Sequence, residues 1–290
     1  MIAVRLAGGL GNQLFQTMTA LLLSKRRGQP VLLLTQALGR YAAARQPDVL
    51  RLIGSDRLLR NRVPSQYRWQ SWAALQLRAG RWVPAWGFGD ANFPGDLDIP
   101  ARWALVDGYF QRGWNDVLID EARCLAQLAP VVATPGAPSF DCVLHVRGSD
   151  FLGLQQYAFL AADHYERGLA LAWREGCRRF AIVTDDSAHA NRLLTQLQHS
   201  HPEANFMLMP PAADALQDFE TLRAAPYRII GNSTFAWWAS ALGVRDAITW
   251  APDRFTRDVV RDYFLPGERC LRNPAPAFAT TVHSRTMMKS

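Results

Sequence analysis

Three short segments of the sequence carry side chains that bind phosphate and sugar groups, each directly after an apolar run. Arg147 lies in the segment His145–Asp150, after the first run. Asp185 and Asp186 follow the second run, and the segment Asn232–Phe235 follows the third. Arginine makes paired hydrogen bonds to phosphate, helix N-terminal amides stabilise anions, and carboxylates accept hydrogen bonds from ribose hydroxyls or base amino groups. Together these groups fit a ribonucleotide diphosphate.

Each segment also has a purely structural interpretation, and the functional one depends on their convergence. Arg147 and Asp150 could form an ion pair within a turn, since such surface pairs are common and weak. Asp185 and Asp186 could serve only to cap the helix that follows them. Core packing or helix capping is the corresponding alternative for His145, Ser233, Thr234 and Phe235.

A glycine-rich loop near the start of the chain invites comparison with dinucleotide-binding loops. Gly9 and Gly11 match the first two glycines of the pattern Gly-x-Gly-x-x-Gly, but Leu14 stands in the third place. No acidic residue occurs in 31–40, where the ribose-binding carboxylate would be expected, and the absence of Gly-Lys-Ser/Thr excludes a P-loop. A tight strand-to-helix turn is the structural alternative. A glycine loop also lets a ligand approach the backbone closely.

The elements that position these segments follow an α/β pattern. Alternating strands and helices after a proline-rich stretch at 130–138 indicate a parallel sheet covered by helices, with ligands at the carboxyl ends of its strands. Residues 35–100 are expected to form short helices and loops. We expect strands at 2–6, 31–34, 103–107, 141–146, 180–184, 205–209, 227–231 and 247–250, and helices at 13–27, 115–129, 163–177, 187–199, 213–224 and 234–242. The domains are predicted at 1–135 and 136–275, with a tail at 276–290.

Composition narrows the class of protein. In 290 residues, 49% hydrophobic and 20% charged residues fit a soluble two-domain protein and argue against disorder, collagen and coiled coil. The net charge of +7 leaves a nucleic-acid binder open, but all but two of the 32 basic residues are scattered arginines. The four cysteines lack metal-site spacing, so we expect reduced thiols and no metal. No secretory signal or membrane span is expected, which predicts a cytoplasmic location, with peripheral contact at the inner membrane as an alternative.

Five segments, in this order, resemble the bacterial α-1,2-fucosyltransferases of glycosyltransferase family 11. Gly8–Gln16 is the first, and Gly108–Gln111 is the second. The others are His145–Phe151, Val183–Asp186 and Ile230–Ala239. The resemblance implies a GT-B-like fold of two Rossmann-type α/β domains facing a cleft, GDP-fucose as donor, inversion at the anomeric carbon, and no metal or other cofactor. It also implies transfer to the 2-hydroxyl of a terminal galactose in an oligosaccharide or glycolipid.

The resemblance assigns roles to individual positions. Arg147 would bind the β-phosphate, and the acidic residue at the guanine–ribose end would be Asp185 or Asp186. Asp150 is a candidate general base, although it could instead hold Arg147, and a mechanism in which the phosphate of GDP takes the proton needs no protein base. Gly148 departs from the family, which usually has a second arginine there. The remaining donor-binding residues implied are His145, Asn232, Ser233, Thr234, Phe235, Gly11, Asn12 and Gln13, with the N-terminal domain also on the acceptor side.

Two other functions stay open at this point. One is another nucleotide-sugar or dinucleotide-dependent enzyme that uses the Gly9–Gly11 loop, against which the missing third glycine counts. The other is a nucleic-acid-binding protein, which the positive charge would favour. The tryptophan- and arginine-rich stretch at 61–103 could recognise an acceptor sugar or belong to the core.

Overall fold

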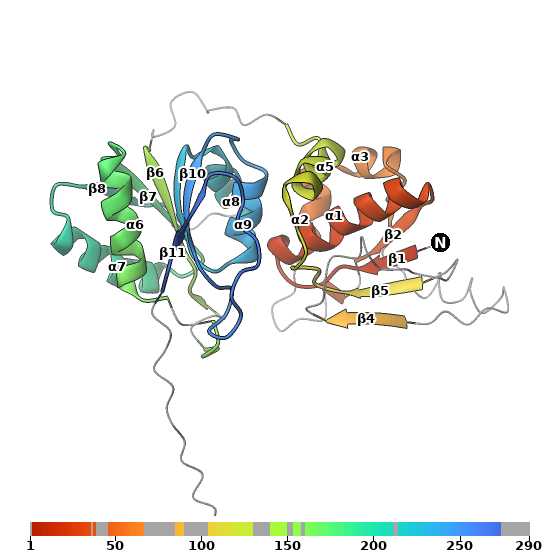
Figure 1. The fold of residues 1–290 in the computed structure, drawn as a ribbon, viewed down its shortest axis with the longest axis horizontal. Helices are drawn as coiled ribbons and strands as arrows, with labels where there is room; N and C mark the ends of the chain where they lie inside the picture. Colours follow the sequence, from red (N-terminus) through yellow and green to blue (C-terminus); the bar gives the residue numbers. More distant parts are fainter. Residues whose placement is uncertain are drawn as a thin grey trace, which may run out of the picture.

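The protein consists of two α/β halves, each built on its own parallel sheet (Figure 1). The computed structural model describes residues 2–35, 37–38, 46–66, 85–89, 104–129, 140–149, 153–157, 160–210 and 214–273. The expected linker at 130–138 and the expected tail at 276–290 lie outside these residues. Every strand pairing among the described residues is parallel.

The N-terminal half has a five-stranded sheet and four described helices. Its strands are β1 (Ile2–Arg5), β2 (Val31–Leu34), β3 (Ser65–Gln66), β4 (Ala85–Gly89) and β5 (Ala104–Gly108), in the order β3-β2-β1-β5-β4. Its helices are α1 (Leu10–Arg27), α2 (Asp48–Ile53), α3 (Ser55–Arg60) and α5 (Asp116–Ala126). Helix α1 ends at Gly28, whose φ of 62° is the left-handed conformation that glycine adopts at helix ends. Its last turn is basic, which complements the helix dipole.

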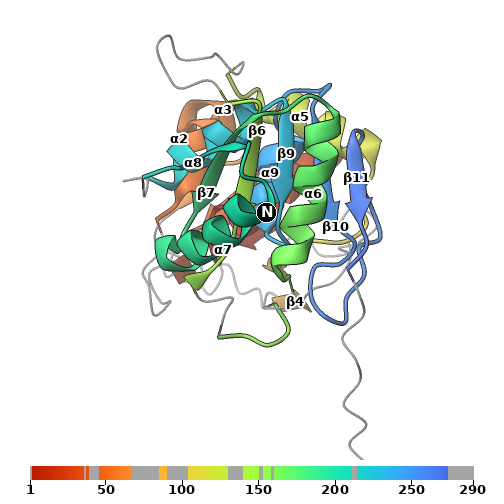
Figure 2. The same ribbon diagram turned by 90° about the vertical axis from the view of Figure 1, so that its left-hand side faces the viewer.

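The C-terminal half has a six-stranded sheet with helices on both faces (Figure 2). Its strands are β6 (Cys142–Val146), β7 (Arg179–Thr184), β8 (Asn205–Leu208), β9 (Tyr227–Ile230), β10 (Ile248–Pro252) and β11 (Glu268–Leu271), in the order β11-β10-β9-β6-β7-β8. Helices α6 (Ala162–Arg174) and α7 (Ser187–Ser200) cover one face, and α8 (Ala215–Ala224) and α9 (Thr234–Ala241) cover the face toward the N-terminal half. This strand order is that of a Rossmann fold.

The expected strands and helices are present, with small shifts at their ends. Helix α1 begins at Leu10 rather than at 13, because the amide of Gln13 already donates to the carbonyl of Gly9 at 3.0 Å. Strands β3, β4 and β11 were not expected; each of them lies at an edge of its sheet and pairs with a single neighbour. No helix in the described part of the chain is long and apolar enough to cross a membrane.

The two halves share one hydrophobic core at their interface. Phe15 of α1 packs against Trp237 and Trp238 of α9, with ring centroids 5.0 Å apart in both pairs. Trp114, next to α5, lies 5.2 Å from Trp238 in an edge-on contact. These rings belong to a single cluster that continues from β1 in one half to β9 in the other. Because a close-packed aromatic core joins them, the halves have a fixed relative position.

Candidate functional site

The two sheets bring their ligand-binding edges together. In an open α/β sheet, ligands bind beside the carboxyl ends of the strands, where the strand order reverses. In the N-terminal sheet this point lies between β1 and β5, and in the C-terminal sheet it lies between β6 and β9. The glycine-rich loop follows β1, Gln111 follows β5, Arg147 follows β6 and Ser233 follows β9. The predicted segments therefore sit at the two positions where the topology favours a ligand.

Gly11 lies where the two halves approach each other closely. A Cβ atom added to Gly11 would lie 2.4 Å from the backbone nitrogen of Phe235 and 2.5 Å from the hydroxyl of Thr234. The first turns of α1 and α9 therefore touch. Helix N-termini carry unpaired amides and partial positive charge, and the first turns of both helices contain no acidic residue. The contact therefore brings the positive ends of the α1 and α9 helix dipoles together.

Asn12 links the halves through its side chain. Its Oδ1 accepts a hydrogen bond from Gln111 Nε2 at 3.0 Å and another from Thr234 Oγ1 at 3.2 Å. The bonds join three of the five segments that carry the family resemblance, although Asn12 and Thr234 are far apart in the sequence. Gln13, by contrast, is completely buried, and its amide bonds to Gly8 O, Gln46 O and the amide of Val49. Gln13 shapes the loop instead of facing the donor as predicted.

Arg147 is held at the end of β6 by Asp185. Its Nη1 lies 2.5 Å from Asp185 Oδ2, and the other carboxylate oxygen accepts from the amide of Gly148 at 2.8 Å. Both side chains are mostly buried, at 20% and 30% exposed. Ser149 Oγ donates to the carbonyl of Asp185 at 2.9 Å. These contacts fix a guanidinium group at the edge of the sheet where the two halves meet.

Gly148 has a steric reason to be glycine. A Cβ atom at this position would lie 2.4 Å from Cβ of Asp186. Asp186 is itself fixed, because its carboxylate caps α7 by accepting from the amide of His189 at 2.9 Å and also accepts from Ser149 at 3.2 Å. These amide bonds lower the pKa of Asp186. A second arginine, as in the family, would not fit here without moving Asp186, which leaves Arg147 as the arginine of this segment.

His145 is a buried neutral residue beside Phe235. The two rings are stacked with centroids 5.7 Å apart, and no described residue bonds to His145 Nδ1. Burial, with a smaller contribution from the charge of Arg147, lowers the pKa of His145 to about 4. The imidazole is therefore uncharged at neutral pH and offers a hydrogen-bonding nitrogen.

Acid should destabilise the protein through its buried histidines. Burial lowers the pKa of His145 and of the fully buried His164 to about 4 each, whereas an unfolded histidine has a pKa of 6.5. The unfolded chain therefore binds more protons, and the stability present above pH 6.5 is lost as the pH falls toward 4. We expect His145→Phe to reduce the slope of unfolding free energy by about 1.4 kcal/mol per pH unit between pH 6 and 4.5.

Denaturant titrations at several pH values test this expectation. The control is Gln198→Asn, at an exposed position on α7, which changes no titrating group and should leave the slope unchanged. An identical slope in the wild type and the His145→Phe variant would contradict the assignment of a neutral buried imidazole.

The residues after β9 divide into two groups. Asn232 is buried, and its Nδ2 donates to the carbonyls of Tyr157 and Phe255 at 3.1 and 2.9 Å, so this nitrogen holds two loops together rather than reaching a donor. Ser233 caps α9, and its Oγ accepts from the amide of Phe235 at 3.2 Å. Ser233 and Phe235 flank Thr234 where α1 meets α9, and the donor-binding roles of all three stay predictions.

Asp218 is a candidate that the sequence did not reveal. It lies on α8, the helix whose Phe219 packs edge-on against Phe235 at 5.4 Å. Burial raises the pKa of Asp218 to about 6, and the negative charge of Asp185 adds to this effect. A half-buried carboxyl group with a raised pKa beside a set of strand ends is typical of a functional site. In the sequence, the only indication of this residue was its acidic type in the first turn of the helix that follows β8.

Two predicted features lie outside the described residues. Asp150, the candidate general base, is one of them. Most of the tryptophan- and arginine-rich stretch at 61–103 is the other.

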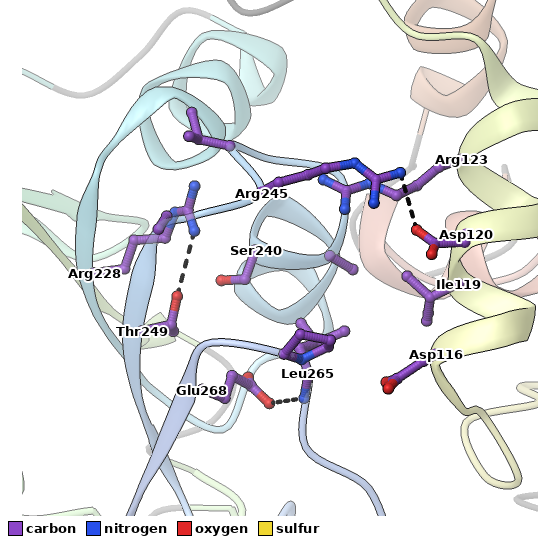
Figure 3. Close-up of a pocket in the computed structure, with 14 residues that line it drawn as sticks. Asp116, Ile119, Asp120, Arg123, Arg228, Ser240, Arg245, Thr249, Leu265 and Glu268 are labelled. Carbon is purple, nitrogen blue, oxygen red and sulfur yellow. Dashed lines mark hydrogen bonds and ion pairs between the residues drawn. The ribbon is translucent and has the colours of Figure 1, made fainter.

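A hollow lies at the C-terminal end of α9, opposite to the end that contacts α1 (Figure 3). It has a volume of about 90 Å³ and lies between α5 and the amino ends of β10 and β11. Charged groups that line it have partners within the protein. Arg245 forms an ion pair with Asp120 at 3.1 Å, and Arg228 donates a hydrogen bond to the hydroxyl of Thr249 at 3.3 Å. None of the predicted site residues lines it. We therefore place the functional site at the strand ends and not in this hollow.

Comparison with known proteins supports the fold. Structures of POFUT1 in complex with GDP and with GDP-fucose align at 10% and 11% identity over 94% of this chain and 97% of theirs, with TM-scores of 0.51 and 0.50. The fucosyltransferase NodZ from Bradyrhizobium aligns at 15% identity over 83% of this chain and 92% of its own, with a TM-score of 0.44. No family model and no curated protein matches the sequence. The chain has the predicted GT-B-like fold of two Rossmann-type halves.

Proposed function

We propose that the protein is an inverting fucosyltransferase of the family 11 type, which transfers L-fucose from GDP-β-L-fucose. The observation that carries the proposal is the guanidinium of Arg147, held by Asp185 at the end of β6. The site also contains the touching N-termini of α1 and α9. Such a site suits the two phosphates of a nucleotide sugar. The structural neighbour POFUT1 binds GDP and GDP-fucose, and it supports this choice of donor.

The guanine base would lie toward β7 and α8. The rings of His145 and Phe235 provide aromatic surface there, and Asp218 provides a carboxyl group. A carboxylate can accept hydrogen bonds from the N1–H and amino groups of guanine, which adenine does not offer in the same pattern. Asp218 therefore gives the proposed site a preference for GDP, and Asp185 remains with Arg147.

The proposed reaction is a displacement at C1 of fucose. The acceptor oxygen forms a bond to C1 as the bond from C1 to the β-phosphate oxygen breaks, and the electron pair of that bond leaves with GDP. The transition state has oxocarbenium character, as in glycoside hydrolysis. Arg147 and the amides at the start of α9 stabilise the charge that develops on the phosphate. The acceptor proton passes to Asp150 or to the departing phosphate.

The acceptor is proposed to be the 2-hydroxyl of a terminal galactose in an oligosaccharide or glycolipid. This assignment is supported by the family resemblance of the five segments, and the N-terminal half would hold the acceptor. The decisive assay offers GDP-fucose with a panel of galactose-terminated glycans and determines the linkage of the product. Transfer of fucose to another hydroxyl would replace the proposed acceptor, and absence of any fucose transfer would refute the activity.

Ligand binding separates this proposal from its alternatives. GDP should raise the melting temperature, since a ligand that binds only the folded state stabilises it, whereas NAD should not. A larger shift with NAD would favour a dinucleotide-dependent enzyme. The proposal includes no nucleic-acid partner, and tight, steeply salt-dependent binding to random duplex DNA would contradict it.

Transfer is proposed to need no metal ion or other cofactor. Arg147 and the helix N-termini supply the positive charge that a metal ion provides in other transferases. We therefore expect fucose transfer to persist after dialysis into excess EDTA, which direct chromatographic measurement of the released GDP would show. Loss of activity that Mn²⁺ or Mg²⁺ restores would contradict this part of the proposal.

A further inference from the structure

We propose that Gln111 is a positioning residue that sets the orientation of the Asn12 amide. This inference rests on the proposed function and adds to it a residue that does not itself touch the donor. The Gln111 side chain donates from Nε2 to Asn12 Oδ1 at 3.0 Å, and this bond joins the segments that follow the paired strands β1 and β5. Asn12 in turn reaches Thr234 in the other half.

The hydrogen bonds to Asn12 leave only its amide nitrogen for a ligand. A carbonyl oxygen has two lone pairs, and Oδ1 uses both, for Gln111 Nε2 and Thr234 Oγ1. Asn12 Nδ2 donates to no residue in the described part of the chain. A Cβ atom at Gly8 would lie 2.5 Å from this nitrogen, so the glycine is what makes room for the Asn12 amide in this position. Asn12 therefore presents N–H groups, which suit an anionic oxygen of the donor.

Gln111 decides this orientation and Thr234 does not. A hydroxyl can donate or accept a hydrogen bond, so Thr234 tolerates either orientation of the Asn12 amide. Gln111 presents its Nε2 group to Asn12, and because this group only donates, Oδ1 of Asn12 faces it; turning Asn12 over would require the Gln111 amide to turn over as well. If Asn12 were turned over, its oxygen would point toward the phosphates and would repel them.

Hydrogen bonds to neighbouring carbonyls hold the backbone near Gln111 in place. Gln16 Nε2 donates to the carbonyl of Gly108 at 3.0 Å, and Trp114 Nε1 donates to the carbonyl of Phe110 at 2.7 Å. Phe110 has a φ of 54°, a left-handed conformation that its packed surroundings must enforce. The segment is thus fixed on both sides of the turn that directs Gln111 toward Asn12.

The sharpest test is the substitution Gln111→Glu. The glutamate side chain has the same shape as glutamine but, when ionised, can only accept hydrogen bonds, so it would reverse the Asn12 amide. For Gln111→Glu at pH 7.5 we expect kcat for fucose transfer to fall about tenfold or more, with Kd for GDP changed less than about threefold. As the pH falls toward 5, the introduced carboxyl group becomes protonated and can donate again. The ratio of variant to wild-type kcat should then rise.

Two further variants make the result specific. Gln111→Met removes the hydrogen bond without imposing an orientation, so kcat should fall less than in Gln111→Glu, with no recovery in acid. Gln196→Glu adds the same charge at an exposed position on α7 and should behave as the wild type. A merely structural role would lower kcat equally in the glutamate and methionine variants at every pH, and that outcome overturns the proposal. So does wild-type turnover in Gln111→Glu.

A measurement without turnover separates this inference from the proposed function. In a double-mutant cycle of Gln111→Met and Asn12→Ala, the unfolding constants should show a coupling of about threefold or more, because the two side chains share a hydrogen bond. An additive cycle overturns the inference even in a protein with no transferase activity. Absence of wild-type fucose transfer with a coupled cycle refutes the proposed function alone.

Discussion

Replacement of Arg147 by alanine is expected to lower kcat for fucose transfer by about 10²–10³-fold, because Arg147 is the guanidinium placed to stabilise charge on the leaving phosphate. The fold should persist, since Arg147 follows the end of β6 and belongs to neither of the large hydrophobic clusters. Single-turnover measurements with saturating GDP-fucose would show whether the loss lies in the chemical step. A circular dichroism spectrum and a melting curve would confirm that the variant is folded.

Two variants control for this result. Arg147→Lys keeps the positive charge but loses the paired geometry of the guanidinium, so it should recover only part of the activity. Arg179→Ala removes another arginine that is paired with an aspartate, Asp141 at 2.8 Å, at the opposite end of the same sheet, and it should retain full activity. Near-normal kcat in Arg147→Ala would refute the assignment of this residue to the phosphate.

Replacement of Trp238 by alanine is expected to lower the free energy of unfolding by about 3–5 kcal/mol, as deletion of a large buried aromatic ring generally does. The ring is fully buried and contacts Phe15, Trp114 and Trp237. Because these residues come from both halves, the loss should affect the whole described fold. Denaturant unfolding followed by circular dichroism would measure it.

The same measurement tests whether the halves are energetically coupled. The wild type should unfold in one transition, and Trp238→Ala should shift that transition to lower denaturant concentration without splitting it. The control is Trp173→Ala, at a position packed only against the core of the C-terminal half. It should lower the free energy of unfolding by less than Trp238→Ala does. Two separate transitions in the wild type would contradict a shared core.

Much of the fold could be predicted from the sequence because its signals are local. Strands β6, β7, β9 and β10 are short, mainly apolar runs followed by a polar turn, and the helices of this half have apolar residues at helical spacing. Such signals fix the element order, and parallel pairing follows from the alternation. Strand β11 escaped prediction because its four residues contain two charged side chains and only its neighbour β10 makes it a strand.

The site was predicted less completely, because its details depend on contacts between distant residues. Arg147 and the residues around Ser233 could be found, since a strand end followed by such side chains is visible in the sequence. Gln13 has a residue type as suitable for a ligand as that of Asn12, yet its partners near 46–49 bury it. Asp218 stands within a helix, and only the packing of that helix brings it toward Asp185. Tertiary contacts thus decide which polar residues face the ligand.

The pairing of Arg147 with Asp185 bears on how the protein responds to salt. The guanidinium already has a counter-ion when no ligand is bound, so an arriving diphosphate meets a partly neutralised cation instead of a bare one. Because Asp185 partly neutralises Arg147, dissolved salt has little unpaired positive charge left to screen. Donor affinity should consequently weaken only slightly as ionic strength rises, in contrast to binding by exposed basic patches. The pairing also favours ligands that make two hydrogen bonds to the guanidinium over small monovalent anions.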